Sequence, residues 1–302
     1  PPVKLGKPYS QIAHLAENIT SVVAINNHLV SLGYSAPKVL QHDLAQGLGL
    51  IEPLGSHVYG KMMQEGADMR EPLEEAAAVL ADMAKHNWPR HPEAAQGINH
   101  TVHDYDEDAQ LIEVDLLPSW FIPHARGLDS TDEQRDEFAS VWRKLLPLAK
   151  PDKPLWTIRD YHSPNLLWIP DRVGIRRVGI IDSQDAVMGH SAYDVMSMAQ
   201  DARVDISTEM QDHIVTHYCN LRKAQGQFNN DEFNTAYAIL GAQRATKILG
   251  IFARLNKRDG KPAYLKHMPR VSRYLQRNLE HKALAPLKAW YVQHAPEAIG
   301  LN

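Results

Sequence analysis

The spacing of apolar residues predicts one helix and one hairpin near the start of the chain. Apolar side chains recur at helical spacing from Asn18 to Leu32, and Gly33 follows, where a glycine commonly ends a helix. Residues 38–43 and 48–52 have the pattern of two short strands joined by a glycine-containing turn. We therefore expect a helix and then a β-hairpin in this region.

The rest of the chain has a mainly helical pattern that is interrupted once by strands. Leu166–Ile169 and Arg177–Ile181 are apolar and rich in β-branched residues, which predicts a second hairpin, and residues 156–158 form a shorter extended run. The predicted helices cover residues 71–86, 106–117, 192–203, 207–225, 230–255, 262–280 and 284–294.

One more helix is predicted from a capping-box pattern. In Ser130-Thr-Asp-Glu133, the serine side chain can accept a backbone N–H three residues on, while Glu133 reaches back to the start of the helix. Apolar residues then recur at steps of three and one from Phe138 to Ala149, which is one face of a helix. Pro147 is expected to kink or end that helix.

Composition narrows the class of protein. Of 302 residues, 44% are hydrophobic and 23% are charged, as in ordinary globular proteins. The single cysteine, Cys219, excludes an internal disulfide framework and favours a reducing cytoplasm. A formal net charge of -4 argues against a dedicated nucleic-acid binder. No apolar run approaches the roughly 18 residues that a membrane-spanning helix needs.

The candidate chemistry lies between residues 159 and 182. The carboxylate of Asp160 can orient a hydroxyl group and accept its proton. The amide oxygen of Asn165 and the carboxylate of Asp182 are the hard oxygen ligands that Mg²⁺ prefers. A base and two magnesium ligands are the minimal equipment for phosphoryl transfer from a nucleotide. Asp and Asn are also common turn residues, so backbone hydrogen bonding in a loop explains the same pattern.

These motifs resemble a known superfamily. Asp160-Tyr-His-Ser-Pro-Asn165 is similar to the D-x-x-x-x-N catalytic loop of aminoglycoside phosphotransferases and choline-kinase-like enzymes. The segment around Asp182 resembles their metal-binding Asp segment, and Gly189 to Asp194 resembles the G-x-x-x-x-D that follows. Within the superfamily, the likeness is greatest to bacterial anomeric amino-sugar kinases, which phosphorylate N-acetylmuramate and N-acetylglucosamine. Further strings that support this likeness are Gln200-Asp-Ala-Arg203, Ala242-Gln-Arg244 and Lys247-x-Leu-Gly-Ile-Phe-Ala-Arg254.

The resemblance implies an α+β, protein-kinase-like fold with two lobes. Residues 1–55 would form a partial N-terminal nucleotide-binding lobe with its hinge, and residues 56–302 a mainly helical catalytic and substrate lobe. The implied activity is ATP- and Mg²⁺-dependent transfer of the γ-phosphoryl group to a hydroxyl group of a small molecule, with an amino sugar as the leading acceptor. Choline, homoserine or an aminoglycoside as acceptor, or a non-catalytic nucleotide-binding relative, are the alternatives. The expected partners are ATP and the acceptor, with no nucleic acid and no membrane.

The resemblance also implies a role for each matching residue. Asp160 would be the catalytic base, and Asn165 and Asp182 would hold Mg²⁺. His162 would lie beside the catalytic loop, near the acceptor or the phosphates. Asp194 would brace the loop from below, although an Asp at a helix N-terminus is also favoured by the helix dipole.

A few further positions complete these expectations. Asp185 is a candidate for contact with the substrate or for support of the site. The backbone around Glu52 and Leu54 resembles the hinge that receives adenine, and a plain strand end explains that segment equally well. Arg203 is expected to make a structural ion pair.

Two departures from the family pattern stand out. Ile158 occupies a position where the family commonly has His, which we expect to alter packing rather than chemistry. The second departure is that no phosphate-covering loop is seen in this sequence. The family pattern places such a loop on strands ahead of it, and without them the enzyme would be degenerate.

Overall fold

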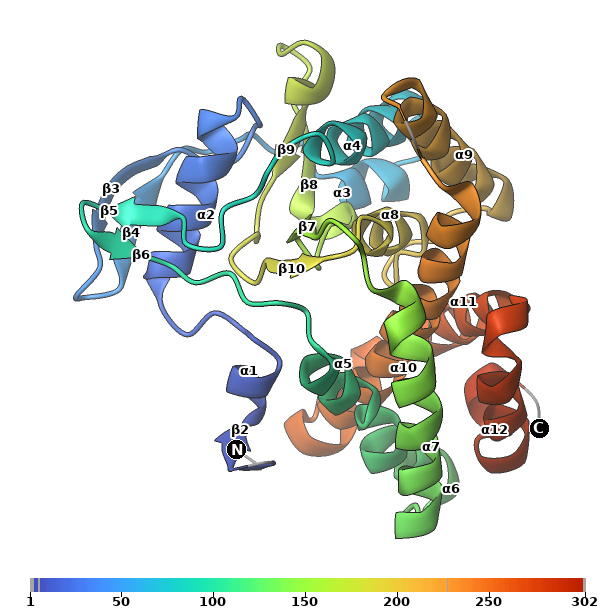
Figure 1. Ribbon diagram of the computed structural model, residues 1–302. Helices are drawn as coiled ribbons and strands as arrows, with labels where there is room; N and C mark the ends of the chain where they lie inside the picture. The colour runs from blue at the N-terminus through green and yellow to red at the C-terminus, as the bar shows by residue number, and fades with distance from the viewer. Residues whose placement is uncertain (1–2, 5, 227, 301–302) are drawn as a thin grey trace. The chain divides into compact units, whose positions relative to one another are not determined.

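The computed structural model describes residues 3–4, 6–226 and 228–300 (Figure 1). These residues are mostly helical and carry several two-stranded antiparallel sheets, which confirms the predicted α+β class. The chain divides into two compact units, each of which is built from segments far apart in the sequence. The two lobes predicted above, 1–55 and 56–302, are a different division and stay a prediction.

One unit comprises His14–Tyr105 and Pro151–Phe228. Its helices are α2 (Ile19–Ser31), α3 (Tyr59–Gln64), α4 (Arg70–Met83), α8 (Ala192–Ala199) and α9 (Thr208–Ala224). Its strands are β3 (Val39–Asp43), β4 (Leu48–Ile51), β5 (Glu93–Ala95), β6 (Ile98–Asn99), β7 (Leu155–Thr157), β8 (Leu166–Trp168), β9 (Val178–Ile180) and β10 (Val187–Gly189). They pair as β3–β4, β5–β6, β8–β9 and β7–β10, all antiparallel.

The helix and the hairpins that the sequence predicts in this unit are confirmed. Helix α2 begins where the side chain of Asn18 accepts the backbone N–H of Thr20 at 3.0 Å, and it ends just before Gly33. That glycine has a φ of +89°, a conformation that is costly for any residue with a Cβ atom. The hairpins β3–β4 and β8–β9 also form where the sequence predicts them.

Two features of this unit differ from the sequence prediction. Helix α8 ends at Ala199 rather than at residue 203, because the chain leaves helical geometry at Gln200. The hairpin β5–β6 and the strand β10 were not predicted, since each strand has only two or three residues and no repeating pattern.

The second unit comprises Pro1–Ala13, Asp106–Lys150 and Asn229–Asn302. Its strands are β1 (Val3–Lys4) and β2 (Lys7–Pro8). Its helices are α1 (Tyr9–Ile12), α5 (Glu107–Val114), α6 (Ile122–Arg126), α7 (Asp132–Leu145), α10 (Asn230–Asp259), α11 (Met268–Leu279) and α12 (Ala285–His294). A π-helical turn, Leu117–Phe121, packs against α10, and α11 packs along the same helix.

The capping box of α7 is shifted by one residue from its predicted place. Thr131 accepts the backbone N–H of Gln134, and the Gln134 side chain accepts the backbone N–H of Thr131. The hydroxyl of Ser130 instead donates to the carbonyl of Pro118 at 3.0 Å. The prediction of Ser130 and Glu133 was therefore wrong in position, because the pattern S/T-x-x-E/Q occurs twice in adjacent registers.

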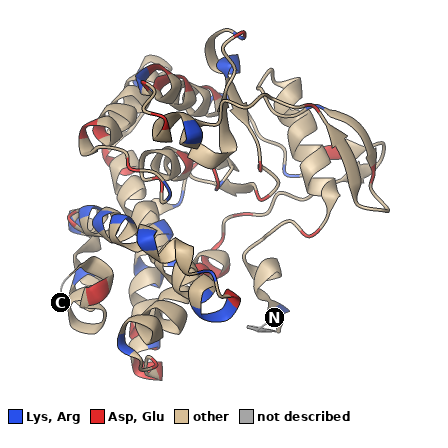
Figure 2. Cartoon of the chain, turned by 180° about the vertical axis from the view of Figure 1, so that it is seen from behind, with Lys and Arg blue, Asp and Glu red and all other residues tan. Residues whose placement is uncertain are grey.

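Charge is unevenly distributed along this unit. Between Arg254 and Lys288 the sequence has ten Lys and Arg but two Asp and Glu, in a chain whose net charge is -4. Figure 2 shows these basic residues gathered on the helices near the C-terminus. Across the described part of the chain, no helix combines the length and the apolar character that a bilayer crossing requires.

Candidate active site

Strand pairing places two of the predicted site residues side by side. Leu166 of β8 lies opposite Ile180 of β9, so the residues just before β8 and just after β9 are neighbours. The backbone N–H of Ile181 donates to the carbonyl of Asn165 at 3.0 Å. This register brings Asn165 and Asp182 to the same end of the hairpin.

The backbone is strained at two positions of this region. Arg159 has a φ of +70° and Asp182 a φ of +60°, in the left-handed region that non-glycine residues rarely adopt. Such residues cluster at active sites, and each costs about 1 to 3 kcal/mol. The strain therefore falls on the residue before Asp160 and on the predicted metal ligand itself.

The amide of Asn165 links the predicted base to the predicted metal ligand. Its Nδ2 donates to the backbone carbonyl of Asp160 at 3.1 Å and to Oδ2 of Asp182 at 3.3 Å. The side chain of Asp160 is 47% exposed, so its carboxylate can meet a hydroxyl group that arrives from solvent. The structure thus brings Asp160, Asn165 and Asp182 together.

The donor atoms at this end of the hairpin fit a magnesium ion. Asp182 is exposed, and its second oxygen, Oδ1, accepts a hydrogen bond from Gln184 at 2.8 Å. A half-turn of the Asn165 amide would present its oxygen beside the Asp182 carboxylate, which gives two hard oxygen ligands. Within the described residues, no group of three or more His, Cys, Asp and Glu is placed to hold a metal. Two ligands suffice for Mg²⁺ that keeps water and phosphate oxygens.

Asp194 lies beneath the loop that carries Asp160. Its side chain is buried, and its two carboxylate oxygens accept the backbone N–H groups of Ile158 at 2.7 Å and Arg159 at 2.9 Å. Charge-assisted hydrogen bonds of this kind are about twice as strong as neutral ones. This carboxylate holds the strained turn at Arg159 in place. The side chain of Ile158 is fully buried, so it contributes packing.

His162 lies between Asp160 and Arg203. Its Nε2 is 3.4 Å from Oδ1 of Asp160 and 3.3 Å from a guanidinium nitrogen of Arg203. A guanidinium can only donate and a carboxylate can only accept, so the two contacts of Nε2 call for opposite tautomers of the ring. The buried Nδ1 faces Oδ2 of Asp201 at 4.0 Å.

Asp201 is a site residue to which sequence reasoning gave no role. It is fully buried, and its carboxylate accepts the backbone N–H groups of Ser163 at 2.8 Å and Arg203 at 2.7 Å. The available signal was its place in Gln200-Asp-Ala-Arg203, two residues before an arginine. The expected ion pair of Arg203 is absent: no carboxylate of the described residues lies within 4.0 Å of its guanidinium.

Asp185 holds the segment that precedes α2. Its Oδ1 accepts the backbone N–H of Ala16 at 2.6 Å. Burial raises the pKa of this carboxyl group, and the negative charges of Asp160 and Asp182 act in the same direction. Asp185 therefore ties the segment before α2 to the loop that carries Asp182.

The predicted hinge residues follow the end of the β3–β4 hairpin. The backbone N–H of Glu52 donates to the carbonyl of Lys38 at 2.8 Å, and its carboxylate lies 3.4 Å from Arg172. The side chain of Leu54 is buried and lies close to Gly179. Adenine binding at Glu52 and Leu54 stays a prediction.

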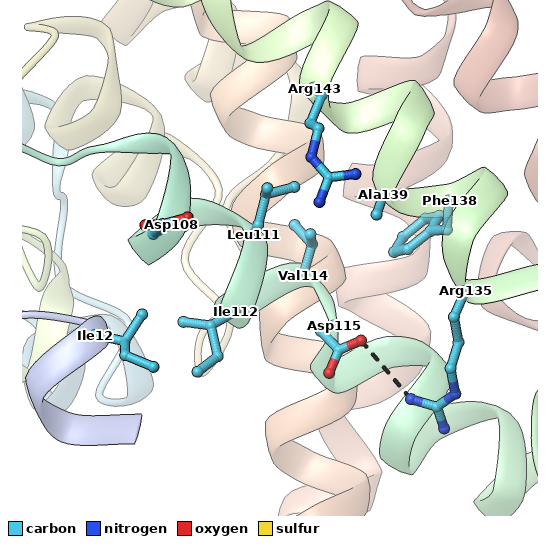
Figure 3. Close-up of a pocket in the computed structure, with 10 residues that line it drawn as sticks. All are labelled: Ile12, Asp108, Leu111, Ile112, Val114, Asp115, Arg135, Phe138, Ala139 and Arg143. Carbon is cyan, nitrogen blue, oxygen red and sulfur yellow. Dashed lines mark ion pairs between the residues drawn. The ribbon is translucent and has the colours of Figure 1, made fainter. Parts of the chain in front are cut away.

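A separate small pocket lies in the other unit, between α1, α5 and α7 (Figure 3). Its volume is about 160 Å³, and its wall combines apolar side chains such as Ile112 and Phe138 with charged ones. Arg135 on its rim is 3.7 Å from Asp115. None of the predicted site residues lines this pocket.

His190, just before α8, gives a testable acid sensitivity. Its Nδ1 accepts the backbone N–H of Ala192 at 3.0 Å. Burial lowers the pKa of His190 to about 4, and the charge of Arg222 adds to the effect. Between pH 6.5 and 4 the unfolded chain binds this proton and the folded chain does not. The free energy of unfolding should therefore fall on acidification by up to about 1.4 kcal/mol per pH unit from this group.

Urea unfolding of wild type and His190→Gln between pH 7 and 4.5 measures this effect. The variant should lose stability less steeply on acidification, whereas His42→Gln, at an exposed strand position, should follow wild type. Parallel curves for His190→Gln and wild type would contradict the assignment.

The chain is similar to known proteins in sequence and in fold. A model of the phosphotransferase enzyme family matches residues 7–228. A protein of Caulobacter vibrioides named N-acetylmuramate/N-acetylglucosamine kinase is 35% identical over 291 residues, which cover 95% of this chain and 78% of that protein.

Two solved structures resemble the fold. A choline/ethanolamine kinase family protein from Mesorhizobium loti has a TM-score of 0.56 at 15% identity, with 90% of this chain and 81% of that chain covered. The GDP complex of aminoglycoside 2'-phosphotransferase-IIIa also has a TM-score of 0.56, at 14% identity, with 87% and 85% covered. These similarities confirm the predicted kinase-like fold class.

Proposed function

The chain belongs to the phosphotransferase enzyme family as a small-molecule kinase, and we propose that it moves the γ-phosphoryl group of ATP to a hydroxyl group of an amino sugar. N-acetylmuramate and N-acetylglucosamine are the proposed acceptors. The observation that carries the phosphotransfer chemistry is the convergence of Asp160, Asn165 and Asp182 at one end of the β8–β9 hairpin. The identity of the acceptor is supported by the relative that is 35% identical.

The proposed reaction is an in-line displacement at phosphorus. The carboxylate of Asp160 accepts a hydrogen bond from the acceptor hydroxyl and takes its proton as the oxygen attacks the γ-phosphorus. A new P–O bond forms to the sugar, the bond to the bridging oxygen breaks, and ADP leaves with that oxygen. The Asp194 carboxylate holds the Asp160 loop in the geometry that this alignment needs.

Asn165 and Asp182 would hold Mg²⁺, which when bound supplies neutralisation of phosphate charge. The exposed Asp182 and its neighbouring amide leave room for the water and phosphate oxygens that such an ion retains.

The test is ADP release from Mg-ATP against a panel of acceptors. N-acetylmuramate and N-acetylglucosamine should be phosphorylated, and choline, homoserine and an aminoglycoside should not. Chelation of the metal with EDTA should stop the reaction, and added Mg²⁺ should restore it. Mass spectrometry of the sugar should show the addition of one phosphoryl group.

Each contrary result has a distinct meaning. Turnover of choline, homoserine or an aminoglycoside with no amino sugar consumed would overturn the proposed acceptor and leave the phosphotransferase assignment intact. Full activity in EDTA would overturn the metal role of Asn165 and Asp182. An enzyme without turnover on any member of the panel would overturn the whole proposal.

A further inference from the structure

Arg203 lies beside the proposed base, at a place where it could contact the acceptor. Asp160 and Arg203 both approach the same nitrogen, Nε2 of His162, at 3.4 Å and 3.3 Å. The guanidinium is therefore within reach of a small molecule whose reacting hydroxyl lies at Asp160.

The backbone of Arg203 is fixed to the catalytic loop. One buried carboxylate, that of Asp201, accepts the N–H of Arg203 through Oδ1 and the N–H of Ser163 through Oδ2. The position of Arg203 relative to the loop is thus set by two charge-assisted hydrogen bonds. Its guanidinium remains exposed at the end of a flexible side chain.

The guanidinium has unused capacity for an anion. It offers five N–H donors, of which one meets His162, and among the described residues it has no carboxylate within 4.0 Å. Of the other charged side chains near the proposed base, Asp182 and Asp185 are acidic, and Arg159 is basic with its charge acting on Asp185. A cation at the edge of an acidic site is suited to bind a carboxylate with two parallel hydrogen bonds.

We propose that Arg203 binds the carboxylate of an acidic amino sugar and thereby sets the preference of the enzyme for that acceptor. The inference rests on the proposed function. N-acetylmuramate and N-acetylglucosamine share the ring, the acetamido group and the anomeric hydroxyl. Only N-acetylmuramate carries a lactyl carboxylate, on the ring carbon two positions from the anomeric one. One bound N-acetylmuramate would thus place its reacting hydroxyl at Asp160 and its carboxylate at Arg203.

The test is the selectivity of the full chain between the two sugars. Arg203→Gln should lower kcat/KM for N-acetylmuramate by about 10- to 100-fold, mainly through KM, because a charge-assisted pair is lost. The value for N-acetylglucosamine should stay within about threefold of wild type. Arg203→Lys keeps the positive charge but lacks the planar guanidinium that can make two parallel hydrogen bonds. Its kcat/KM for N-acetylmuramate should therefore lie between those of wild type and Arg203→Gln.

The matched control is Arg176→Gln, since Arg176 is an exposed arginine on the turn between β8 and β9. It should leave the selectivity ratio unchanged. Thermal unfolding of all variants should match wild type, because both side chains are exposed.

Several results would overturn the inference. An equal loss for both sugars in Arg203→Gln would assign the residue a structural role, and a raised KM for ATP would assign it to the nucleotide. If the wild type phosphorylates both sugars and Arg203→Gln keeps the same ratio of kcat/KM between them, the role of Arg203 is refuted. The proposed function would still stand in that case. A wild type that phosphorylates neither sugar refutes the proposed function and this inference with it.

Discussion

Asp160→Asn is expected to lower kcat for amino-sugar phosphorylation by about 10²- to 10⁴-fold, because it removes the group proposed to take the hydroxyl proton. The amide keeps the size and hydrogen-bonding shape of the side chain but has no basic oxygen. The KM values for ATP and for the sugar should change much less than kcat, since the lost interaction forms only in the transition state. Steady-state kinetics with both substrates varied would measure the split.

The control for this substitution is Asp171→Asn, which makes the same chemical change at an exposed turn residue. It should retain full activity. Because the Asp160 side chain is 47% exposed, the free energy of unfolding of Asp160→Asn should stay within about 0.5 kcal/mol of wild type. A folded Asp160→Asn enzyme with kcat within threefold of wild type would show that another group takes the proton.

Asp194→Ala is expected to lower the free energy of unfolding by about 2 to 4 kcal/mol and to reduce kcat as well. The substitution leaves the backbone N–H groups of Ile158 and Arg159 without their buried acceptor, and each unsatisfied donor costs about 1 to 3 kcal/mol. The strained φ of Arg159 also loses its restraint, so the Asp160 loop should relax. Urea unfolding and hydrogen exchange of the loop amides would measure both effects.

An exposed aspartate provides the comparison for this second substitution. Asp152→Ala removes a carboxylate from a surface loop and should change stability by less than about 0.5 kcal/mol. If Asp194 were there only to favour the N-terminus of α8, its loss would cost about 1 kcal/mol or less and would leave loop exchange unchanged.

The elements that the sequence predicted best are those with a long or strongly marked pattern. Helices α2 and α4 have a full apolar face, and the β8–β9 hairpin has two apolar runs separated by a proline-containing turn. The site prediction rested on residue types before one predicted strand and after the next, together with the family resemblance. The register of the β8–β9 pair then brings Asn165 beside Asp182, which residue types alone do not determine.

The parts that the sequence did not predict depend on contacts between distant segments. The buried carboxylate of Asp201 bonds to Ser163, which is 38 positions away, and no local pattern marks such a partner. The capping box of α7 was misplaced because the pattern fits both Ser130 and Thr131, and the hydroxyl of Ser130 instead bonds to Pro118, twelve positions away. The short strands of β5–β6 lack enough residues for alternation to be visible.

The left-handed backbone at Arg159 and Asp182 has an evolutionary consequence. Glycine is the residue that such a conformation favours, so backbone strain alone would select for glycine at both positions. At Asp182 the proposed role as a metal ligand opposes that change, whereas at Arg159 the buried side chain, which lies over the Tyr105 ring, opposes it through packing. In a lineage that has abandoned catalysis, Asp182 should therefore become glycine sooner than Arg159.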